Sequence, residues 1–192
     1  MQGFSYTAAM SKDFSPDHLD VKAFAQAGAT LTGSDPLSRY TRLAQDAEGP
    51  VDGLQVDWRA EGELRAESGG ASHLWLHLTV EAGLPLTCQR CLQLDRMPLQ
   101  VDRSFRFVAD EATAEALDDE AEEDLLALSR DFDLRALIED ELLMALPLVP
   151  RHEVCPQELP MQSSDADFEQ ASEEKPNPFA VLQGLRKNGA PD

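Results

Sequence analysis

A long alternating stretch that ends in two cysteines constrains the fold of this chain most strongly. From Leu74 to Leu86 every second residue is apolar, and a two-residue period is that of a β-strand with one buried face. Directly after this stretch, Cys88 and Cys91 stand three positions apart. This spacing allows a tight turn to direct both sulfur atoms to one point, as in a zinc knuckle or a dithiol redox pair.

Two further alternating segments flank this strand. Residues 54–60 precede it and residues 99–107 follow it, and Ser68-Gly69-Gly70 supplies the residues that a hairpin turn requires. We predict an antiparallel β-meander from these three segments. Arg103 falls on the apolar parity of the third strand, so we expect it at a sheet edge with its guanidinium group reaching solvent.

Helices are predicted on both sides of the meander. Ser15 can cap a first helix that ends at Gly28, a short strand at 29–32 follows, and Ser34 can cap a second helix that ends at Gly49-Pro50. Asp133 can cap a third helix, which Pro147 ends. The predicted fold class is therefore α+β, with an antiparallel sheet covered by helices.

One carboxylate falls inside the apolar stripe of the third helix. Glu141 projects between the directions of Leu134 and Leu137, and a buried carboxylate requires a partner. We expect a structural ion pair with Arg103, Arg90 or Arg151. A catalytic acid is the alternative, but the sequence places no second carboxylate or histidine beside it.

Composition suggests one folded domain and a tail. With 192 residues, 42% of them hydrophobic, the chain can build one core, which we assign to residues 1–155. Residues 156–175 are rich in acidic and polar side chains and are predicted to be a flexible acidic linker. Residues 176–187 are predicted to form a short helix that docks on this domain or on a partner, through the stripe of Phe179, Leu182 and Leu185.

The charge limits the partners. A net charge of −20 repels phosphate and attracts basic proteins. Six of the seven residues from Asp118 to Asp124 are acidic, which predicts a solvated loop, with a binding site for a basic partner as the alternative. The odd number of cysteines, and the lack of a leader or an apolar run of about 20 residues, predict a cytoplasmic protein with no membrane contact.

A second pair of candidate ligands repeats the cysteine spacing. His152 and Cys155 are also three positions apart, so three thiolates and one imidazole could surround Zn²⁺ if the third helix returns this loop to the first turn. Reduced thiols packed near the core, a dithiol redox pair and a disulfide are the alternatives that the sequence leaves open.

Three segments together resemble a known family. Residues 86–91, 133–152 and 175–182 match, in order and spacing, the YceD family of bacterial and plastid proteins implicated in accumulation of 23S ribosomal RNA. The resemblance implies an assembly factor that supports synthesis, processing or stability of this RNA, and it supplies no defined reaction and no catalytic residues. We expect this factor to act by binding and not by catalysis. The implied partners are 23S rRNA or its precursor, a basic large-subunit ribosomal protein, or both.

An acidic protein that serves an RNA requires a local basic patch or a basic protein partner. Between Cys88 and Phe107 four arginines oppose only Asp95 and Asp102, and they are predicted to contact RNA phosphates: Arg90, Arg96, Arg103 and Arg106. The alternatives are ordinary solvated arginines with a chaperone role for the acidic loop, or a zinc- or thiol-dependent enzyme that acts on ribosomal precursors.

Overall fold

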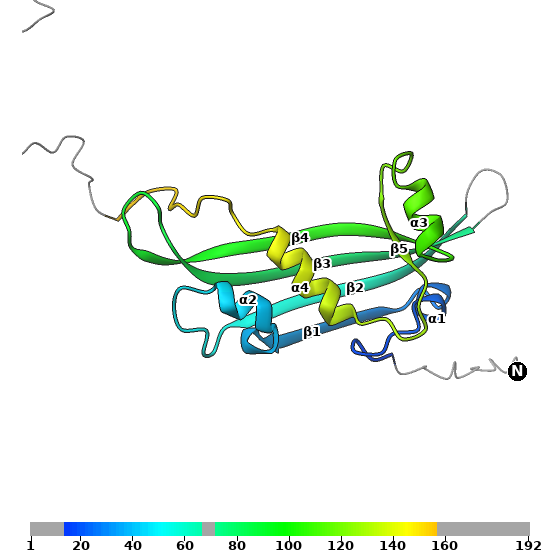
Figure 1. Ribbon diagram of the computed structural model, residues 1–192. Helices are drawn as coiled ribbons and strands as arrows, with labels where there is room; N and C mark the ends of the chain where they lie inside the picture. The colour runs from blue at the N-terminus through cyan, green and yellow to red at the C-terminus, as the bar shows by residue number, and fades with distance from the viewer. Residues whose placement is uncertain (1–13, 67–71, 157–192) are drawn as a thin grey trace, which may run out of the picture. The chain divides into compact units, whose positions relative to one another are not determined.

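A five-stranded sheet forms the frame of the molecule. The computed structural model describes residues 14–66 and 72–156 (Figure 1). The strands lie in the order β1-β2-β3-β4-β5, and the first four pair antiparallel with their neighbours. The last strand instead pairs parallel with β4. Their bounds are β1 Thr30–Pro36, β2 Gln55–Ala66, β3 Ser72–Thr87, β4 Leu94–Val108 and β5 Asp124–Ala127. The α+β class and the meander are confirmed, and β5 makes the sheet mixed.

The alternation of β3 has the predicted effect. Its apolar parity is buried apart from half-buried Ala82, while the other parity at His77 and Thr79 is half-buried. β3 is paired along most of its length on both sides, and the apolar parities of adjacent strands meet, as at Val80 and Val101. Burying each large side chain of this face contributes about 1.5–3 kcal/mol, so this face supplies most of the core.

Within residues 14–66 and 72–156, four α-helices and one 3₁₀ helix accompany the sheet. Their bounds are α1 Val21–Gln26, η1 Leu37–Arg39, α2 Thr41–Asp46, α3 Glu111–Leu117 and α4 Leu134–Met144. α4 crosses the middle of the sheet, with α2 beside it (Figure 1). No helix in the described part of the chain has the length and apolar character that a membrane crossing requires.

The predicted starts of the first two helices were wrong. α1 begins at Val21, where Asp20 and not Ser15 accepts a hydrogen bond from the N–H of Ala23. Ser34 belongs to β1, where it pairs with Asp57 in β2. Ladder pairing there outweighs the local capping tendency of a serine, because each paired strand residue also helps to bury the core face.

The start of α4 was predicted correctly, but the buried carboxylate of this helix is Glu139 and not Glu141. Asp133 caps the helix by accepting from the N–H of Ala136 at 2.9 Å. Glu139 is buried, and one of its oxygens accepts from the backbone N–H of Arg42 at 2.7 Å. This contact satisfies an N–H in the first turn of α2, which lacks a side-chain cap of its own. Glu139 therefore fixes α2 to α4.

Glu141, the carboxylate singled out in the sequence, is half-buried. Burial raises its pKa, and the nearby Arg103 guanidinium opposes that rise. Arg103 is about half exposed and forms its own ion pair with Asp124 in β5. The arginine thus reaches solvent at the sheet edge as expected, while its direct carboxylate partner is Asp124.

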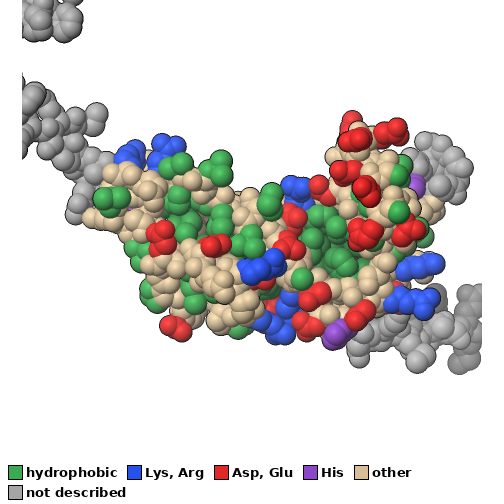
Figure 2. All heavy atoms as spheres, viewed as in Figure 1, with side chains coloured by type: hydrophobic (Ala, Val, Ile, Leu, Met, Phe, Trp, Pro, Cys, Tyr) green, Lys and Arg blue, Asp and Glu red, His purple; other side chains and the backbone are tan. Residues whose placement is uncertain are grey.

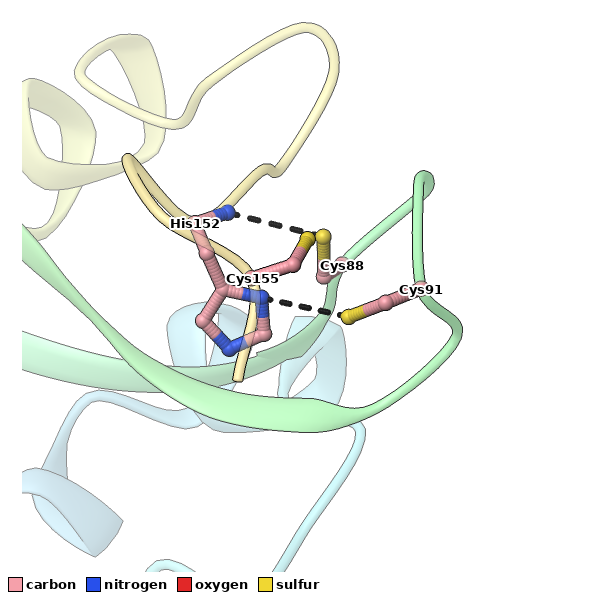
Figure 3. Close-up of side chains that lie close together, drawn as sticks. All are labelled: Cys88, Cys91, His152 and Cys155. Carbon is pink, nitrogen blue, oxygen red and sulfur yellow. Dashed lines mark hydrogen bonds between the residues drawn. The ribbon is translucent and has the colours of Figure 1, made fainter. Parts of the chain in front are cut away.

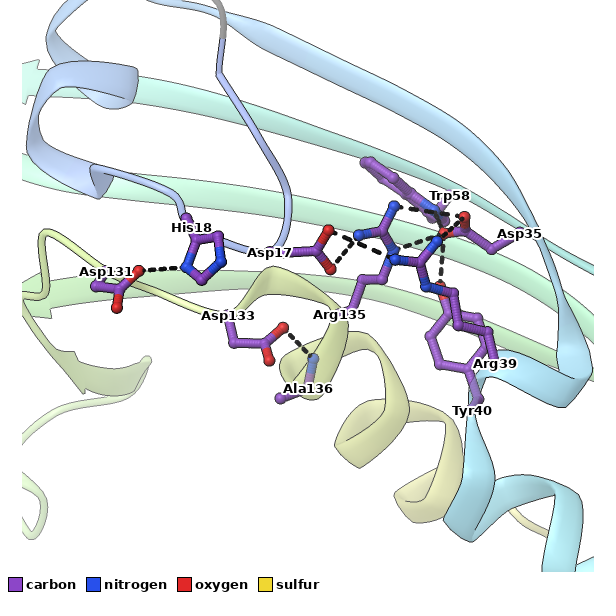
Figure 4. Close-up of polar contacts among 10 residues, drawn as sticks. All are labelled: Asp17, His18, Asp35, Arg39, Tyr40, Trp58, Asp131, Asp133, Arg135 and Ala136. Atoms are coloured by element: carbon purple, nitrogen blue, oxygen red, sulfur yellow. Dashed lines mark hydrogen bonds and ion pairs between the residues drawn. The ribbon is translucent and has the colours of Figure 1, made fainter.

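A buried polar network joins β1, β2 and α4 (Figure 4). Asp35 accepts hydrogen bonds from Trp58 Nε1 at 2.8 Å, from Tyr40 OH at 3.1 Å and from Arg135 Nε at 3.1 Å. Burial would raise the pKa of Asp35, but these donors and the Arg135 charge lower it below its ordinary value. Arg135 also pairs with Asp17. The network anchors the N-terminal part of α4 to the sheet.

Candidate metal centre

The turn between β3 and β4 is tight and carries two of the cysteines. The Leu92 N–H donates to the Cys88 carbonyl at 2.8 Å, and the Cys88 N–H donates to the Gln93 carbonyl at 2.9 Å. Leu92 has a φ of +59°, a left-handed conformation that costs a non-glycine residue about 1–2 kcal/mol. The turn therefore accepts strain at Leu92 while it directs both thiols to one side (Figure 3).

The loop after α4 returns to this turn. This arrangement is the one that the sequence requires for a metal site shared by the turn and the loop. The Gln89 N–H donates to the Pro150 carbonyl at 2.8 Å. Arg90 Nη2 donates to the His152 carbonyl at 3.1 Å and to the Glu153 carbonyl at 3.5 Å. Backbone and side-chain bonds thus hold two segments together that lie about sixty residues apart in the chain.

Four potential ligands converge between the turn and the loop. The sulfur atoms of Cys88, Cys91 and Cys155 and a ring nitrogen of His152 all lie within 4.8 Å of one another (Figure 3). Cys91 Sγ is 3.3 Å from His152 Nδ1. With Zn–S near 2.3 Å and Zn–N near 2.0 Å, tetrahedral ligand atoms are about 3.5–3.8 Å apart. The cluster can hold a metal ion after small adjustments of its side chains.

The electrostatics of Cys88 favour the form of sulfur that binds metals. Burial would raise the pKa of its thiol, but backbone N–H groups of His152, Cys91 and Arg90 and the His152 side chain lower it to about 5. The His152 N–H donates to the sulfur at 3.5 Å. At neutral pH Cys88 is therefore a thiolate, which is the ligand form of cysteine.

Packing of reduced thiols in the core fits one of the three cysteines. Cys88 is fully buried, whereas Cys91 and Cys155 are half-buried at the surface. Cys91 and Cys155 therefore lie near the core and not inside it, so packing of reduced thiols in or near the core stays the alternative to a metal site.

Sequence reasoning missed Asp95 as part of this site. It counted Asp95 only as an acid that opposes the arginines, yet Asp95 Oδ2 lies 3.2 Å from His152 Nε2. The register of the sheet pairs Asp95 with Leu86, two residues before Cys88. An acidic residue four positions after a Cys-x-x-Cys turn is the signal that could have identified it.

The structure does not bring the four candidate RNA-binding arginines together. Arg90 is in the turn, Arg103 is on the parity of the buried Val101, and Arg96 and Arg106 are on the other parity of β4. Ten residues of strand separate Arg96 from Arg106, which is about 33 Å. Arg106 Nε also forms an ion pair with Glu123 at 2.8 Å. Their role as RNA contacts stays a prediction.

The structure describes the acidic run but not the predicted C-terminal helix. Residues 118–123 form turns and bends between α3 and β5, and residues of this run pair with Arg103 and Arg106. The predicted docking helix at 176–187, with Phe179, Leu182 and Leu185, lies outside the described residues, as does all but the first residue of the predicted linker at 156–175.

Exposed apolar side chains collect around the candidate centre. A hollow of about 1000 Å³ lies beside it, lined among others by Arg90, Asp95 and Val149. Figure 2 shows hydrophobic side chains over the end of the sheet that carries the β3–β4 turn. The exposed apolar residues of the turn and the returning loop are Leu92, Leu94, Leu148, Val149 and Val154, and we call them the apolar rim. Such a concentration is typical of a protein interaction surface.

Comparison with known proteins places the chain in a family. Residues 76–186, more than half of the chain, match the family described as large ribosomal RNA subunit accumulation protein YceD. A protein of that name from Haemophilus influenzae is 33% identical over 111 residues, which cover 56% of this chain and 63% of the relative. No solved structure matches the chain. The matched segment includes the turn, α4 and all four candidate ligands, and this chain belongs to the YceD family.

Proposed function

We propose that this protein supports accumulation of 23S rRNA by binding a component of the large ribosomal subunit, and that it does not catalyse a reaction. The observation that carries the proposal is the match over residues 76–186 to a family named for large ribosomal RNA subunit accumulation. The shared segment spans 63% of the Haemophilus influenzae relative, so the role of that protein comes to this chain as a proposal.

The ion that we propose for the cluster is Zn²⁺. Three thiolates and one imidazole form a soft, four-donor set, which favours zinc over the oxygen-seeking Mg²⁺ and Ca²⁺. Four protein ligands close a tetrahedral site, whereas a catalytic zinc keeps one position for water or substrate. The donor set therefore supports a structural zinc that fastens the loop after α4 to the β3–β4 turn.

The geometry favours a basic large-subunit ribosomal protein as the direct partner. The chain has a net charge of −20, and two of the four candidate arginines already pair with Glu123 and Asp124. Direct binding of RNA phosphates requires cations that are available to them. The apolar rim offers a surface for a protein, and the net negative charge of the whole chain attracts a basic one.

A thiol enzyme that acts on ribosomal precursors is the second candidate function. The low pKa of Cys88 favours it. The same thiol is fully buried, however, so a substrate could reach it only after the loop moves away. Binding without catalysis therefore fits the site better.

Photocrosslinking in growing cells tests the proposal. A photoreactive amino acid replaces Leu148, which is fully exposed in the apolar rim, and in a matched control it replaces exposed Ala112 on α3. We expect adducts to one basic large-subunit protein from position 148 only, and a reduced ratio of 23S to 16S rRNA in cells that lack the protein. Adducts mainly to RNA would overturn the choice of partner, and an unchanged rRNA ratio would overturn the role.

A further inference from the structure

The two ring nitrogens of His152 face different partners. Nδ1 lies 3.3 Å from Cys91 Sγ and belongs to the ligand cluster, while Nε2 lies 3.2 Å from Asp95 Oδ2. A neutral imidazole carries its proton on one nitrogen and can bind a metal only through the other. A carboxylate at Nε2 therefore favours the tautomer that leaves Nδ1 available for the metal.

Asp95 is held in place to act in this way. It lies near the start of β4, where its backbone pairs with Leu86 in β3. Its other oxygen, Oδ1, accepts a hydrogen bond from the backbone N–H of Arg96 at 2.8 Å. The His152 side chain is only 12% exposed, whereas that of Asp95 is 46% exposed. The imidazole is thus enclosed between the sulfur atoms and a carboxylate that the sheet orients.

We propose that Asp95 is the positioning residue of the metal centre: it orients His152 and holds the proton on Nε2, so that Nδ1 binds the ion. This inference rests on the proposed zinc site. Asp95 is not itself a ligand, because the three cysteines and His152 already supply four donors. A carboxylate that accepts from a metal-bound histidine fixes the ring and raises its basicity, and removing such a partner lowers metal affinity about 10- to 100-fold.

Zinc affinity, measured by competition with a chromophoric chelator, tests the assignment. We expect Asp95→Asn to raise the dissociation constant about 10-fold and Asp95→Ala about 100-fold, with one zinc per chain retained in both. Asp95→Glu keeps the carboxylate and should recover part of the lost affinity. The matched control is Asp102→Asn. Asp102 is in β4, like Asp95, and its Oδ1 lies 3.4 Å from Nε2 of a histidine, His77 in β3, which is outside the cluster. This control should bind zinc as tightly as the wild type.

A second readout separates positioning from mere packing. In ¹⁵N spectra of the zinc-loaded protein, His152 should carry its proton on Nε2, and solvent exchange of this proton should be faster in Asp95→Ala. Comparing the thermal unfolding of the zinc-free proteins shows whether a substitution acts on the fold itself. We expect wild type and Asp95→Asn to unfold at the same temperature without metal.

The outcomes distinguish failure of the proposed zinc site from failure of the proposed role of Asp95. If the wild type binds no zinc under reducing conditions, the proposed zinc site fails and the inference falls with it. If the wild type binds zinc but the Asp95 variants have the same zinc affinity and the same solvent exchange of the His152 Nε2 proton, the zinc site stands and the role of Asp95 is wrong. A variant that loses stability equally with and without zinc also contradicts the role, since its effect is then on folding.

Discussion

Two polar clusters of the described residues lie at opposite ends of α4 and differ in chemistry. Near the N-terminal end, Arg135 meets Asp35, which also accepts from Trp58 and Tyr40. Beyond the C-terminal end, His152 and the cysteines bring their ligand atoms to within 4.8 Å of one another. Charge and hydrogen bonding within the chain complete the first cluster, whereas the second has the donor set of a metal site. The chemistry of the side chains thus separates a structural network from a candidate centre.

The largest effect is expected at the candidate metal centre. Cys88→Ser should abolish tight zinc binding, because it removes the buried thiolate ligand. If free zinc is at 1,000 times the dissociation constant, the ion contributes about 4 kcal/mol to the free energy of unfolding. In a chain of this size that is about 8–16 °C in unfolding temperature, measurable by calorimetry. Adding a chelator should lower the wild type to the level of the variant and leave the variant unchanged; a chelator effect of equal size on both would contradict the assignment.

A slightly smaller loss is expected in the Asp35 network. Arg135→Met removes the nearer of the two cations beside the Asp35 carboxylate, since Arg39 Nη1 still lies 3.8 Å from Asp35 Oδ1. It should cost about 3 kcal/mol, near the lower limit for a broken buried pair, because Trp58 and Tyr40 also still donate. Chemical denaturation measures this loss. Zinc affinity should not change, so a variant that loses both stability and zinc would show that the two clusters are not independent.

The pH dependence of stability should also differ between the wild type and Arg135→Met. Asp35 has a lowered pKa in the fold, so its contribution is fully present above the unfolded value of about 3.8–3.9. This contribution is lost as the pH falls through the lower folded value. Denaturation between pH 6 and pH 3 should therefore show a weaker acid dependence in Arg135→Met than in the wild type. Equal slopes would mean that Arg135 does not stabilise the carboxylate.

The smallest effect is expected at the strained residue of the turn. Leu92→Gly relieves a left-handed conformation at a site whose side chain is 75% exposed. We expect a gain of up to about 1 kcal/mol in the free energy of unfolding, since glycine adopts this conformation without steric cost. Zinc affinity should stay the same or rise slightly. Destabilisation in the zinc-loaded protein would show that the Leu92 side chain makes contacts that outweigh the strain.

Local patterns in the sequence predicted the features that neighbouring residues determine. The alternation through Leu78 and Val80 predicted β3 and its buried face, Asp133 predicted the start of α4, and the two three-residue spacings selected the residues of the cluster. The roles of Asp95 and Glu139 were not predicted. Each depends on a partner from a distant segment, His152 for one and the first turn of α2 for the other. The register of the strands and the packing of helices determine such pairs, and spacing along the chain does not reveal them.

X-ray absorption at the zinc edge tests the central claim most directly, because it reports the atoms bound to the ion. The protein is purified under reducing conditions and loaded with one equivalent of zinc. The account predicts a first shell of three sulfur atoms at about 2.3 Å and one nitrogen atom at about 2.0 Å, and no retained zinc in Cys88→Ser. A shell of oxygen and nitrogen atoms only, or zinc that washes off the wild-type protein, would contradict it.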